Sequence, residues 1–224
     1  YGVTNPQFCG ANAEYALASA AMMARKPSQL THIEAASVPV VAVTAWQMLF
    51  DYAQLTAGQR ILILGAAGNV GGYAVQLAAR AGLHLIATAR RKDTEYVRSL
   101  GAETVIDFET GRFEDSVSPV DAVIDTVGGE TRDRSFRTLK SGGILVSVVS
   151  ADPLPKHPNV RAVFFYAEVT IARLNNISRL FDRAELVTEV GTVLSLEKAR
   201  AAHEMLAGAP HKRGKIVLSV SDGL

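Results

Sequence analysis

The stretch Arg60-Ile-Leu-Ile-Leu-Gly65-Ala-Ala-Gly-Asn-Val-Gly71 decides the fold of this 224-residue chain. Its first residues form a short apolar run, which is typical of a buried strand. Glycines follow at once, and apolar residues at helical spacing then continue to Ala81. We therefore predict a strand over 60–65, a tight glycine turn and a helix over 70–81, the opening unit of a parallel α/β sheet.

Strands and helices continue to alternate after this opening unit. The pattern predicts further strands over 84–88, 104–107, 120–125 and 143–147, and helices over 94–100 and 130–139. Strict alternation of this kind is typical of a doubly wound parallel sheet with helices on both faces. We therefore predict an α/β core.

The two flanks of the core have a different character. Before it, the sequence predicts short β-like pieces over 13–17 and 22–24, and a capping box at Thr31-His-Ile-Glu34 that opens a buried helical segment. Pro153, Pro155 and Pro158 mark the loop that leaves the core. After it, the pattern predicts a strand over 163–166, a helix over 170–181, a strand-like piece over 190–194, a helix over 196–206 and a last strand over 215–220.

Composition restricts the class of partner. The formal net charge is +1, so no strong field would attract nucleic acid, and no apolar run reaches the roughly 20 residues of a membrane helix. One cysteine, Cys9, excludes an intrachain disulfide and fits a reducing compartment, with the cytoplasm as the default. The chain begins at Tyr1, and we expect no signal peptide. A small molecule is the expected partner.

The glycine turn predicts a nucleotide site. Glycine permits positive φ and close backbone approach, and the helix that follows directs unpaired N–H groups and its positive dipole end at the turn. Strand, turn, helix and second strand in this order favour dinucleotide binding over a structural turn that binds nothing. Asn69 either donates to a phosphate or caps the helix. The residues predicted to contact the cofactor here are Gly65, Ala67, Gly68, Asn69, Val70 and Gly71.

The end of the second strand bears on the choice of cofactor. NAD-specific proteins place an acid there to hold the ribose 2′-hydroxyl. Here Ala89 is followed by Arg90-Arg91-Lys92, and guanidinium groups match a phosphate with paired charged hydrogen bonds. We therefore predict NADPH, with Ala89, Arg90 and Arg91 in the site. Asp93 leaves NADH as the less favoured alternative, and a solvated basic loop is the structural alternative.

Several motifs in one order resemble a known family. Gly65-Ala-Ala-Gly-Asn-Val-Gly-Gly72, followed by Ala74-Val-Gln-Leu-Ala78 and Leu100-Gly-Ala-Glu-Thr-Val-Ile-Asp107, is similar to the zinc-independent, quinone oxidoreductase-like branch of the medium-chain dehydrogenase/reductases. Further segments that agree are Glu34-Ala-Ala-Ser-Val-Pro39, Thr44-Ala-Trp46, Asp125-Thr-Val-Gly-Gly129 and Gly142-Gly-Ile-Leu-Val-Ser147. The likeness runs from Gly10 to Val220.

The resemblance implies a domain plan. Residues 36–165 would form a Rossmann-type dinucleotide-binding domain. Residues 1–35 would end a GroES-like barrel that binds substrate, and residues 166–224 would return to it. The front half of the family pattern is absent from this sequence, so the barrel is expected to be incomplete. Because an incomplete sheet exposes unpaired edges, we expect a second copy to cover them in a homodimer, or else the first residues to be poorly ordered.

The resemblance adds residues to the cofactor site, namely Val127 and Val148 at later strand ends, Thr44, Phe164 and Phe165. Thr44 either approaches the cofactor or bonds its own helix backbone. Phe164 and Phe165 either flank the nicotinamide or belong to the core. Phe108 stands where some NADPH-using relatives have a tyrosine, which slightly weakens the case for NADPH.

Neither zinc nor a catalytic side chain is expected. Val40 stands where zinc-dependent relatives carry a ligand cysteine, and only Cys9 lies where they insert a four-cysteine lobe. The five histidines are scattered, with no carboxylate or nucleophile at a suggestive spacing. Tyr15 and Tyr166 are candidate proton donors, or otherwise half-buried strand tyrosines. The catalytic residues stay unassigned.

The resemblance and the cofactor motifs together imply an activity. We expect an NADPH-dependent, zinc-independent reductase that transfers hydride to a quinone or a similar conjugated carbonyl. Reduction of an enoyl or enone double bond is the alternative within enzymes. A redox sensor that binds NADPH without turnover is the alternative from another class.

Overall fold

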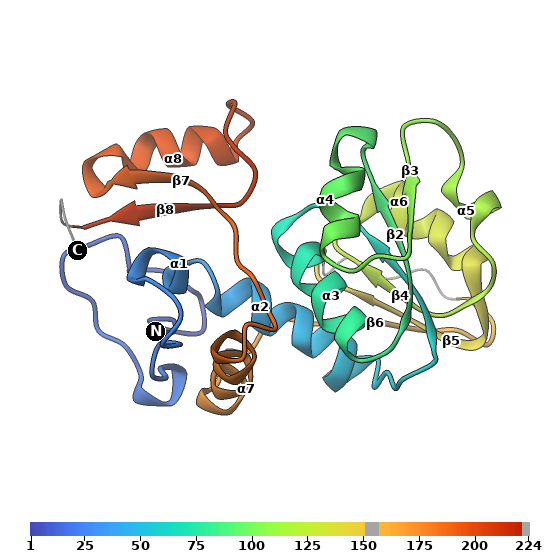
Figure 1. Ribbon diagram of the computed structural model, residues 1–224, viewed down its shortest axis with the longest axis horizontal. Helices are drawn as coiled ribbons and strands as arrows, with labels where there is room; N and C mark the ends of the chain where they lie inside the picture. Colours follow the sequence, from blue (N-terminus) through green and yellow to red (C-terminus); the bar gives the residue numbers. More distant parts are fainter. Residues whose placement is uncertain (151–156, 221–224) are drawn as a thin grey trace. The chain divides into compact units, whose positions relative to one another are not determined.

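The computed structural model describes residues 1–150 and 157–220, which form two compact units (Figure 1). We call residues 44–167 the sheet unit, and residues 1–43 with 168–224 the terminal unit. The predicted dinucleotide-binding domain over 36–165 and the predicted substrate domain over 1–35 and 166–224 stay predictions. Of the three prolines expected in the loop after the core, Pro158 is described, whereas Pro153 and Pro155 lie outside the described residues.

The sheet unit contains a six-stranded parallel sheet in the order β3-β2-β1-β4-β5-β6. Its strands are β1 (Arg60–Leu64), β2 (His84–Ala89), β3 (Thr104–Asp107), β4 (Val120–Asp125), β5 (Leu139–Ser147) and β6 (Arg161–Phe164). The order reverses between β1 and β4, which is the point where doubly wound sheets bind ligands beyond the carboxyl ends of their strands.

Helices cover both faces of this sheet. They are α3 (Asn69–Arg80), α4 (Thr94–Ser99), α5 (Phe113–Ser116) and α6 (Gly129–Ser135), with 3₁₀ turns η3 (Arg91–Asp93) and η4 (Phe136–Thr138). α3 contacts β1 and β2, and α4 contacts β2 and β3. Leu62 and Leu64 pack with Phe113 and Phe136 in one buried cluster. Because alternate residues of a strand point to opposite faces of the sheet, Leu62 and Leu64 face this cluster and the residue between them faces the other side. The parallel sheet with its helices confirms the predicted doubly wound fold.

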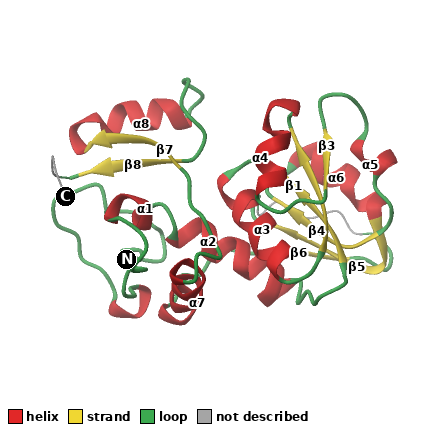
Figure 2. Cartoon of the chain, in the orientation of Figure 1, coloured by secondary structure: helices red, strands yellow, loops and turns green. Residues whose placement is uncertain are grey.

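The terminal unit joins the two ends of the chain. Its elements are η1 (Ala20–Met22), α1 (His32–Ala36), α7 (Ile171–Asp182), β7 (Val190–Ser195), η5 (Leu196–Lys198), α8 (Ala199–Leu206) and β8 (Lys215–Ser219). α2 (Pro39–Trp46) begins in this unit, and the π-helical turn η2 (Gln47–Tyr52) follows it in the sheet unit. β7 and β8 pair in parallel as a two-stranded sheet (Figure 2).

Polar contacts tie the two segments of the terminal unit together. The Tyr1 hydroxyl donates to the Leu174 carbonyl at 2.9 Å and lies 2.9 Å from the Ser178 hydroxyl. The Ser28 hydroxyl donates to the Asp182 carboxylate at 2.7 Å. The predicted capping box is present, because the Thr31 side chain accepts from the Glu34 N–H and the Glu34 carboxylate accepts from the Thr31 N–H.

Of two expectations for the first residues, one was wrong and one is confirmed only in part. The segment 13–17 forms no strand and is exposed to solvent, because nothing in the described chain pairs with its backbone. Around 22–24 the described chain has only an isolated bridge between Met23 and Gly2, next to the 3₁₀ turn η1. Alternating side chains alone do not make a strand without a partner.

Two boundaries in the core also differ from the prediction. The helix expected over 130–139 ends early, because Leu139 pairs with Val120 and already belongs to β5. The glycines expected to end that helix lie inside β5, where the register shifts as in a β-bulge. The strand expected over 163–166 is β6, which begins at Arg161 and ends at Phe164. Within residues 1–150 and 157–220, no helix combines the length and hydropathy needed to cross a membrane.

Candidate functional site

The turn between β1 and α3 is built for close backbone approach. Gly65 has φ of +76°, and a Cβ there would lie 2.6 Å from the Thr126 hydroxyl oxygen. A Cβ on Gly71 would lie 2.2 Å from the Gly65 carbonyl oxygen, so the helix packs directly against the turn. Both glycines are therefore required by space, and Gly65 also by conformation.

The first turn of α3 presents backbone donors to this site. Gly68 is the N-cap residue, and the N–H of Gly72 donates to its carbonyl at 2.8 Å. The N–H groups of Asn69, Val70 and Gly71 precede that bond and point out of the helix end. The Asn69 side chain is not the cap, contrary to the structural alternative for that residue, because Asn69 is already the first helical residue. A free helix end of this kind suits a diphosphate.

The charged side chains at the end of β2 differ in their exposure to solvent. Ala89 is 2% exposed, whereas Arg90 and Arg91 are exposed. Asp93, the acid that left NADH as an alternative, is buried at 8% exposure before α4. Arg90 Nε lies 3.7 Å from an Oε1 of Glu109. The two guanidinium groups are therefore exposed to solvent at this strand end, whereas the Asp93 carboxylate is buried.

Thr88 joins β2 to the glycine turn. Its hydroxyl accepts from the Gly65 N–H at 3.3 Å, and its carbonyl accepts from the Ala66 N–H at 3.1 Å. Thr88 itself is 1% exposed. The turn is thus held in place by the residue two positions before Arg90.

A buried carboxylate organises the ends of β4 and β5. One oxygen of Asp125 accepts from the N–H groups of Val127 and Gly128 at 3.0 and 2.9 Å. The other accepts from the Ser147 hydroxyl at 2.6 Å, and Asp125 is fully buried. This arrangement leaves Val127 46% exposed at the strand edge, where the resemblance expects it to meet the cofactor.

Register brings most of the predicted residues to one edge. Leu64 pairs with Asp125, Asp125 with Ser147, and Ser147 with Phe164. These paired residues end their strands, so the residues that come directly after them are neighbours at the carboxyl edge of the sheet. They include the glycine turn (Gly65, Ala67, Gly68), Val127, Val148 and Phe165, with Ala89, Arg90 and Arg91 beyond β2.

Three predicted residues are buried or half-buried, including Phe165 at the carboxyl edge. Thr44 lies in α2 and is 5% exposed. Phe165 is 7% exposed and stacks on Tyr52 with ring centroids 4.2 Å apart, as a core residue does. Phe164 is half-buried and meets Tyr166 edge to face at 5.1 Å. Their assignment to the cofactor site stays a prediction.

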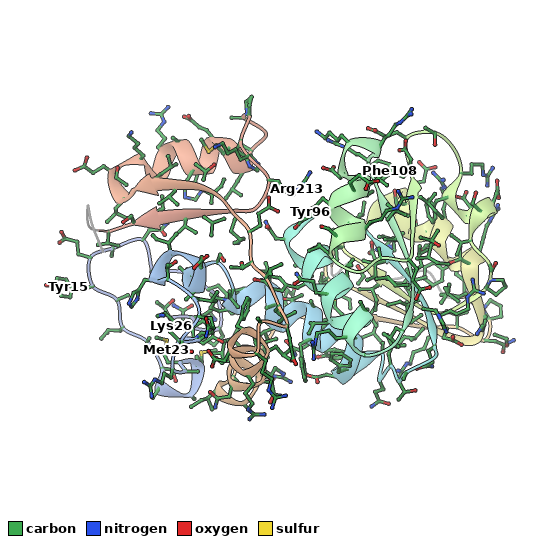
Figure 3. All side chains as sticks on the ribbon, in the orientation of Figure 1. Tyr15, Met23, Lys26, Tyr96, Phe108 and Arg213 are labelled. Atoms are coloured by element: carbon green, nitrogen blue, oxygen red, sulfur yellow. The ribbon has the colours of Figure 1, made fainter. Side chains whose placement is uncertain are left out.

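The two tyrosines considered as proton donors are strongly exposed. Tyr15 is 92% exposed and Tyr166 is 79% exposed, so neither is the half-buried strand tyrosine of the structural alternative. Figure 3 shows Tyr15 pointing away from the ribbon. Among the described residues, no group of three His, Cys, Asp or Glu side chains is arranged to hold a metal ion.

Sequence reasoning missed three residues that shape the site. Thr88 and Asp125 hold the turns, and the Thr126 hydroxyl donates to the Leu64 carbonyl at 2.7 Å. Asp125 and Thr126 belong to the quoted motif Asp125-Thr-Val-Gly-Gly129, which was the available signal. The bonds of Thr88 to Gly65, of Thr126 to Leu64 and of Asp125 to Ser147 join residues at least 22 positions apart, which a local pattern does not reveal. The bonds of Asp125 to Val127 and Gly128 are local.

A Rossmann-type sheet with a glycine turn at its switch point defines the class of dinucleotide-binding α/β proteins. The family model for zinc-binding dehydrogenases matches residues 100–218. A probable zinc-binding oxidoreductase of Arthroderma benhamiae is 30% identical over 230 residues, which cover 94% of this chain and 69% of that protein. The chain belongs to this family, the medium-chain dehydrogenase/reductases, and is quinone oxidoreductase-like within it.

Other relatives agree with this membership. A mitochondrial NAD(P)H oxidoreductase of Bos taurus is 38% identical over 150 residues, which are 63% of this chain but only 38% of that protein. The quinone oxidoreductase structure of Coxiella burnetii superimposes with a TM-score of 0.81 at 33% identity, covering 91% of this chain and 66% of that one. The chain therefore matches only part of the length of these relatives.

Proposed function

We propose that this chain is the cofactor-binding part of an NADPH-dependent reductase that transfers hydride to a quinone or a similar conjugated carbonyl without zinc. The observation that carries the proposal is the carboxyl edge of the sheet. There the glycine turn, the free N–H groups of α3 and two exposed arginines follow adjacent strands. This arrangement matches the diphosphate and the adenosine end of a dinucleotide.

The preference for NADPH rests on the two strand-end arginines. Arg90 and Arg91 are exposed, whereas the acid nearest to them in sequence, Asp93, is buried. A guanidinium donates two parallel hydrogen bonds to a phosphate, and each charged contact is worth about 1.5–3 kcal/mol. The exposed charges at this strand end therefore favour a 2′-phosphate over a free hydroxyl.

The chain's residues would hold the cofactor, which supplies the hydride from its nicotinamide C4 when bound. The N–H groups of Asn69, Val70 and Gly71 would receive the diphosphate. Val127 and Val148 would present apolar surface at the strand edge and exclude water, which strengthens the electrostatic contacts of the site. Asp125 would keep the Val127 turn in place through its bonds to Val127 and Gly128.

A quinone or conjugated carbonyl is the substrate class because such acceptors take hydride without metal polarisation. The resemblance places Val40 at the position of a zinc ligand, and valine offers no ligand atom. Elemental analysis of the purified protein should therefore find no stoichiometric zinc, and chelators should change neither fold nor activity. One tightly held zinc per chain would contradict the zinc-independent assignment.

Enoyl reduction is the second candidate. The solved CurK enoyl reductase superimposes with a TM-score of 0.78 at 27% identity over 87% of this chain and 64% of that one. The two activities use the same cofactor and differ in the acceptor. Steady-state NADPH oxidation with a panel of quinones, enones and enoyl thioesters separates them. Binding of NADPH with no turnover, in a protein that includes the remainder of the family length, would favour the redox-sensor alternative.

The cofactor assignment is tested by replacing Arg90 and Arg91 together with alanine. We expect the dissociation constant for NADPH to rise at least tenfold, because two charged contacts to phosphate are lost. The dissociation constant for NADH should change little. The control replaces Arg137 with alanine. This exposed basic residue lies on η4, directly before β5, and therefore at the amino edge of the sheet. Equal losses for both nucleotides would contradict the assignment to NADPH.

A further inference from the structure

An acid from the neighbouring strand faces one of the two cofactor arginines. β2 and β3 pair with Ala89 opposite Asp107, and the N–H of Phe108 donates to the Ala89 carbonyl at 3.3 Å. This register brings Glu109, two residues beyond β3, beside Arg90. Figure 3 labels Phe108 at this end of the sheet unit.

The contact between the two side chains is electrostatic rather than a hydrogen bond. Arg90 Nε and Glu109 Oε1 are 3.7 Å apart, which exceeds the 2.7–3.2 Å of a hydrogen bond. The side chains are 55% and 54% exposed. The N–H donors of Arg90 are therefore not used up by Glu109, but the positive potential around the guanidinium is reduced.

The backbone fixes where this negative charge lies. The N–H of Glu109 donates to the Asp107 carboxylate at 3.0 Å, and the Thr110 hydroxyl donates to the Asp107 carbonyl at 3.1 Å. The turn that carries Glu109 is thus held by Asp107 and does not depend on the Glu109 side chain. Nearby charges on η3 are the exposed Arg91 and Lys92 and the buried Asp93.

We propose that Glu109 is a specificity-determining residue that disfavours a 2′-phosphate and so narrows the preference for NADPH over NADH. The inference rests on the proposed function, in which Arg90 meets the adenosine ribose. A 2′-phosphate carries close to two negative charges, and a carboxylate beside its arginine repels it. A ribose 2′-hydroxyl carries no charge and can donate a hydrogen bond to a carboxylate. The Glu109 carboxylate therefore weakens the binding of NADPH and favours the binding of NADH.

The test is a charge series at position 109 in the wild-type background. Dissociation constants for NADPH and NADH are measured by fluorescence titration at low salt for Glu109→Gln and Glu109→Lys. We expect the ratio of NADPH to NADH affinity to rise roughly threefold to tenfold in E109Q, the effect of one partly exposed charge, and further in E109K. High salt should reduce the gain, because exposed charges are screened.

The matched control is Glu95→Gln, which removes the same charge from α4. Glu95 is exposed and bonds Arg98 at 2.8 Å, and the affinity ratio should not change. An unchanged or lower ratio in E109Q, while wild type binds NADPH, would overturn the inference. A gain that persists undiminished at high salt would also overturn it, since packing rather than charge would be the cause. Failure of the wild type to bind either nucleotide would instead overturn the proposed function.

Discussion

The sheet unit and the terminal unit are stabilised in different ways. In the sheet unit the central strands β1 and β4 each have a neighbouring strand on both sides, and nearly all of their side chains are buried. In the terminal unit a two-stranded sheet and single polar contacts such as Tyr1 to Leu174 connect distant segments. Small changes should therefore cost much in the first unit and little in the second.

Gly71 offers the strongest test of this contrast. In Gly71→Ala the new Cβ would lie 2.2 Å from the Gly65 carbonyl oxygen and 2.9 Å from Ala66 Cα, and both are backbone atoms that cannot move aside. We expect the free energy of unfolding of the sheet unit to fall by about 3 kcal/mol or more. Urea unfolding followed by fluorescence of Trp46, the only tryptophan, measures it.

The control is the neighbouring glycine. A Cβ on Gly72 would have contacts of 3.4 Å or longer, which are ordinary. Gly72→Ala should leave stability unchanged or raise it by about 0.5–1 kcal/mol, because alanine favours the helix. Equal losses from both substitutions would show that the close approach at Gly71 is not the cause.

A buried ion pair provides the next largest effect. The Glu114 carboxylate is fully buried and accepts from Arg134 at 2.9 and 2.6 Å, which lowers the pKa of Glu114 from 4.5 to about 2. The resulting stabilisation is present above pH about 4.5 and is lost as the pH falls towards 2. We expect Glu114→Gln to cost about 2–3 kcal/mol at pH 7 and to flatten the acid side of the stability profile.

Urea unfolding from pH 7 to pH 2.5 measures both effects. The control is Glu103→Gln, since Glu103 is 59% exposed and its carboxylate lies 3.6 Å from His84 Nδ1, beyond hydrogen-bond distance. Its stability profile should follow that of the wild type. A variant at position 114 that keeps the wild-type slope below pH 4.5 would contradict the role of the Arg134 pair.

The capping box of α1 should have a smaller effect, confined to the terminal unit. Thr31→Ala removes the acceptor for the Glu34 N–H and should lower helix stability by about 1 kcal/mol. Hydrogen exchange of the α1 amides should accelerate about fivefold, while the amides of β1 exchange as before. Thr31→Ser keeps a hydroxyl at the cap and should match the wild type. Acceleration in β1 as well would mean that the two units unfold together.

The smallest effect is expected in the exposed segment before η1. Leu17 is 96% exposed and Tyr15 is 92% exposed, so replacing both with serine should change the free energy of unfolding by less than about 0.5 kcal/mol. Urea unfolding of the double variant checks this. A loss above 1 kcal/mol would show that the segment is covered in solution, by a second copy or by further chain.

The same contrast explains how far sequence reasoning reached. The sheet was predictable because short apolar strands and 3.6-residue spacing repeat along contiguous segments. The four-residue helix α5 was not predicted, since one turn is too short to show a period. Leu139 was assigned to a helix because its pairing with Val120 is a non-local choice. Motif spacing predicted that the glycines lie in the β1–α3 turn and the arginines at the end of β2, and their contact with a cofactor stays a prediction. The bonds of Thr88 to Gly65 and of Asp125 to Ser147 cross between strands and could not be read from a local pattern.

Thr88 has one further consequence. Because its hydroxyl and its carbonyl both hold the glycine turn, the turn and the arginines two and three residues later share a single anchor. The span between them is set when the protein folds, before any ligand arrives. In the proposed site, a nucleotide would therefore meet a diphosphate turn and a pair of arginines at a fixed spacing, and a ligand whose charged groups are spaced differently would contact only one of them.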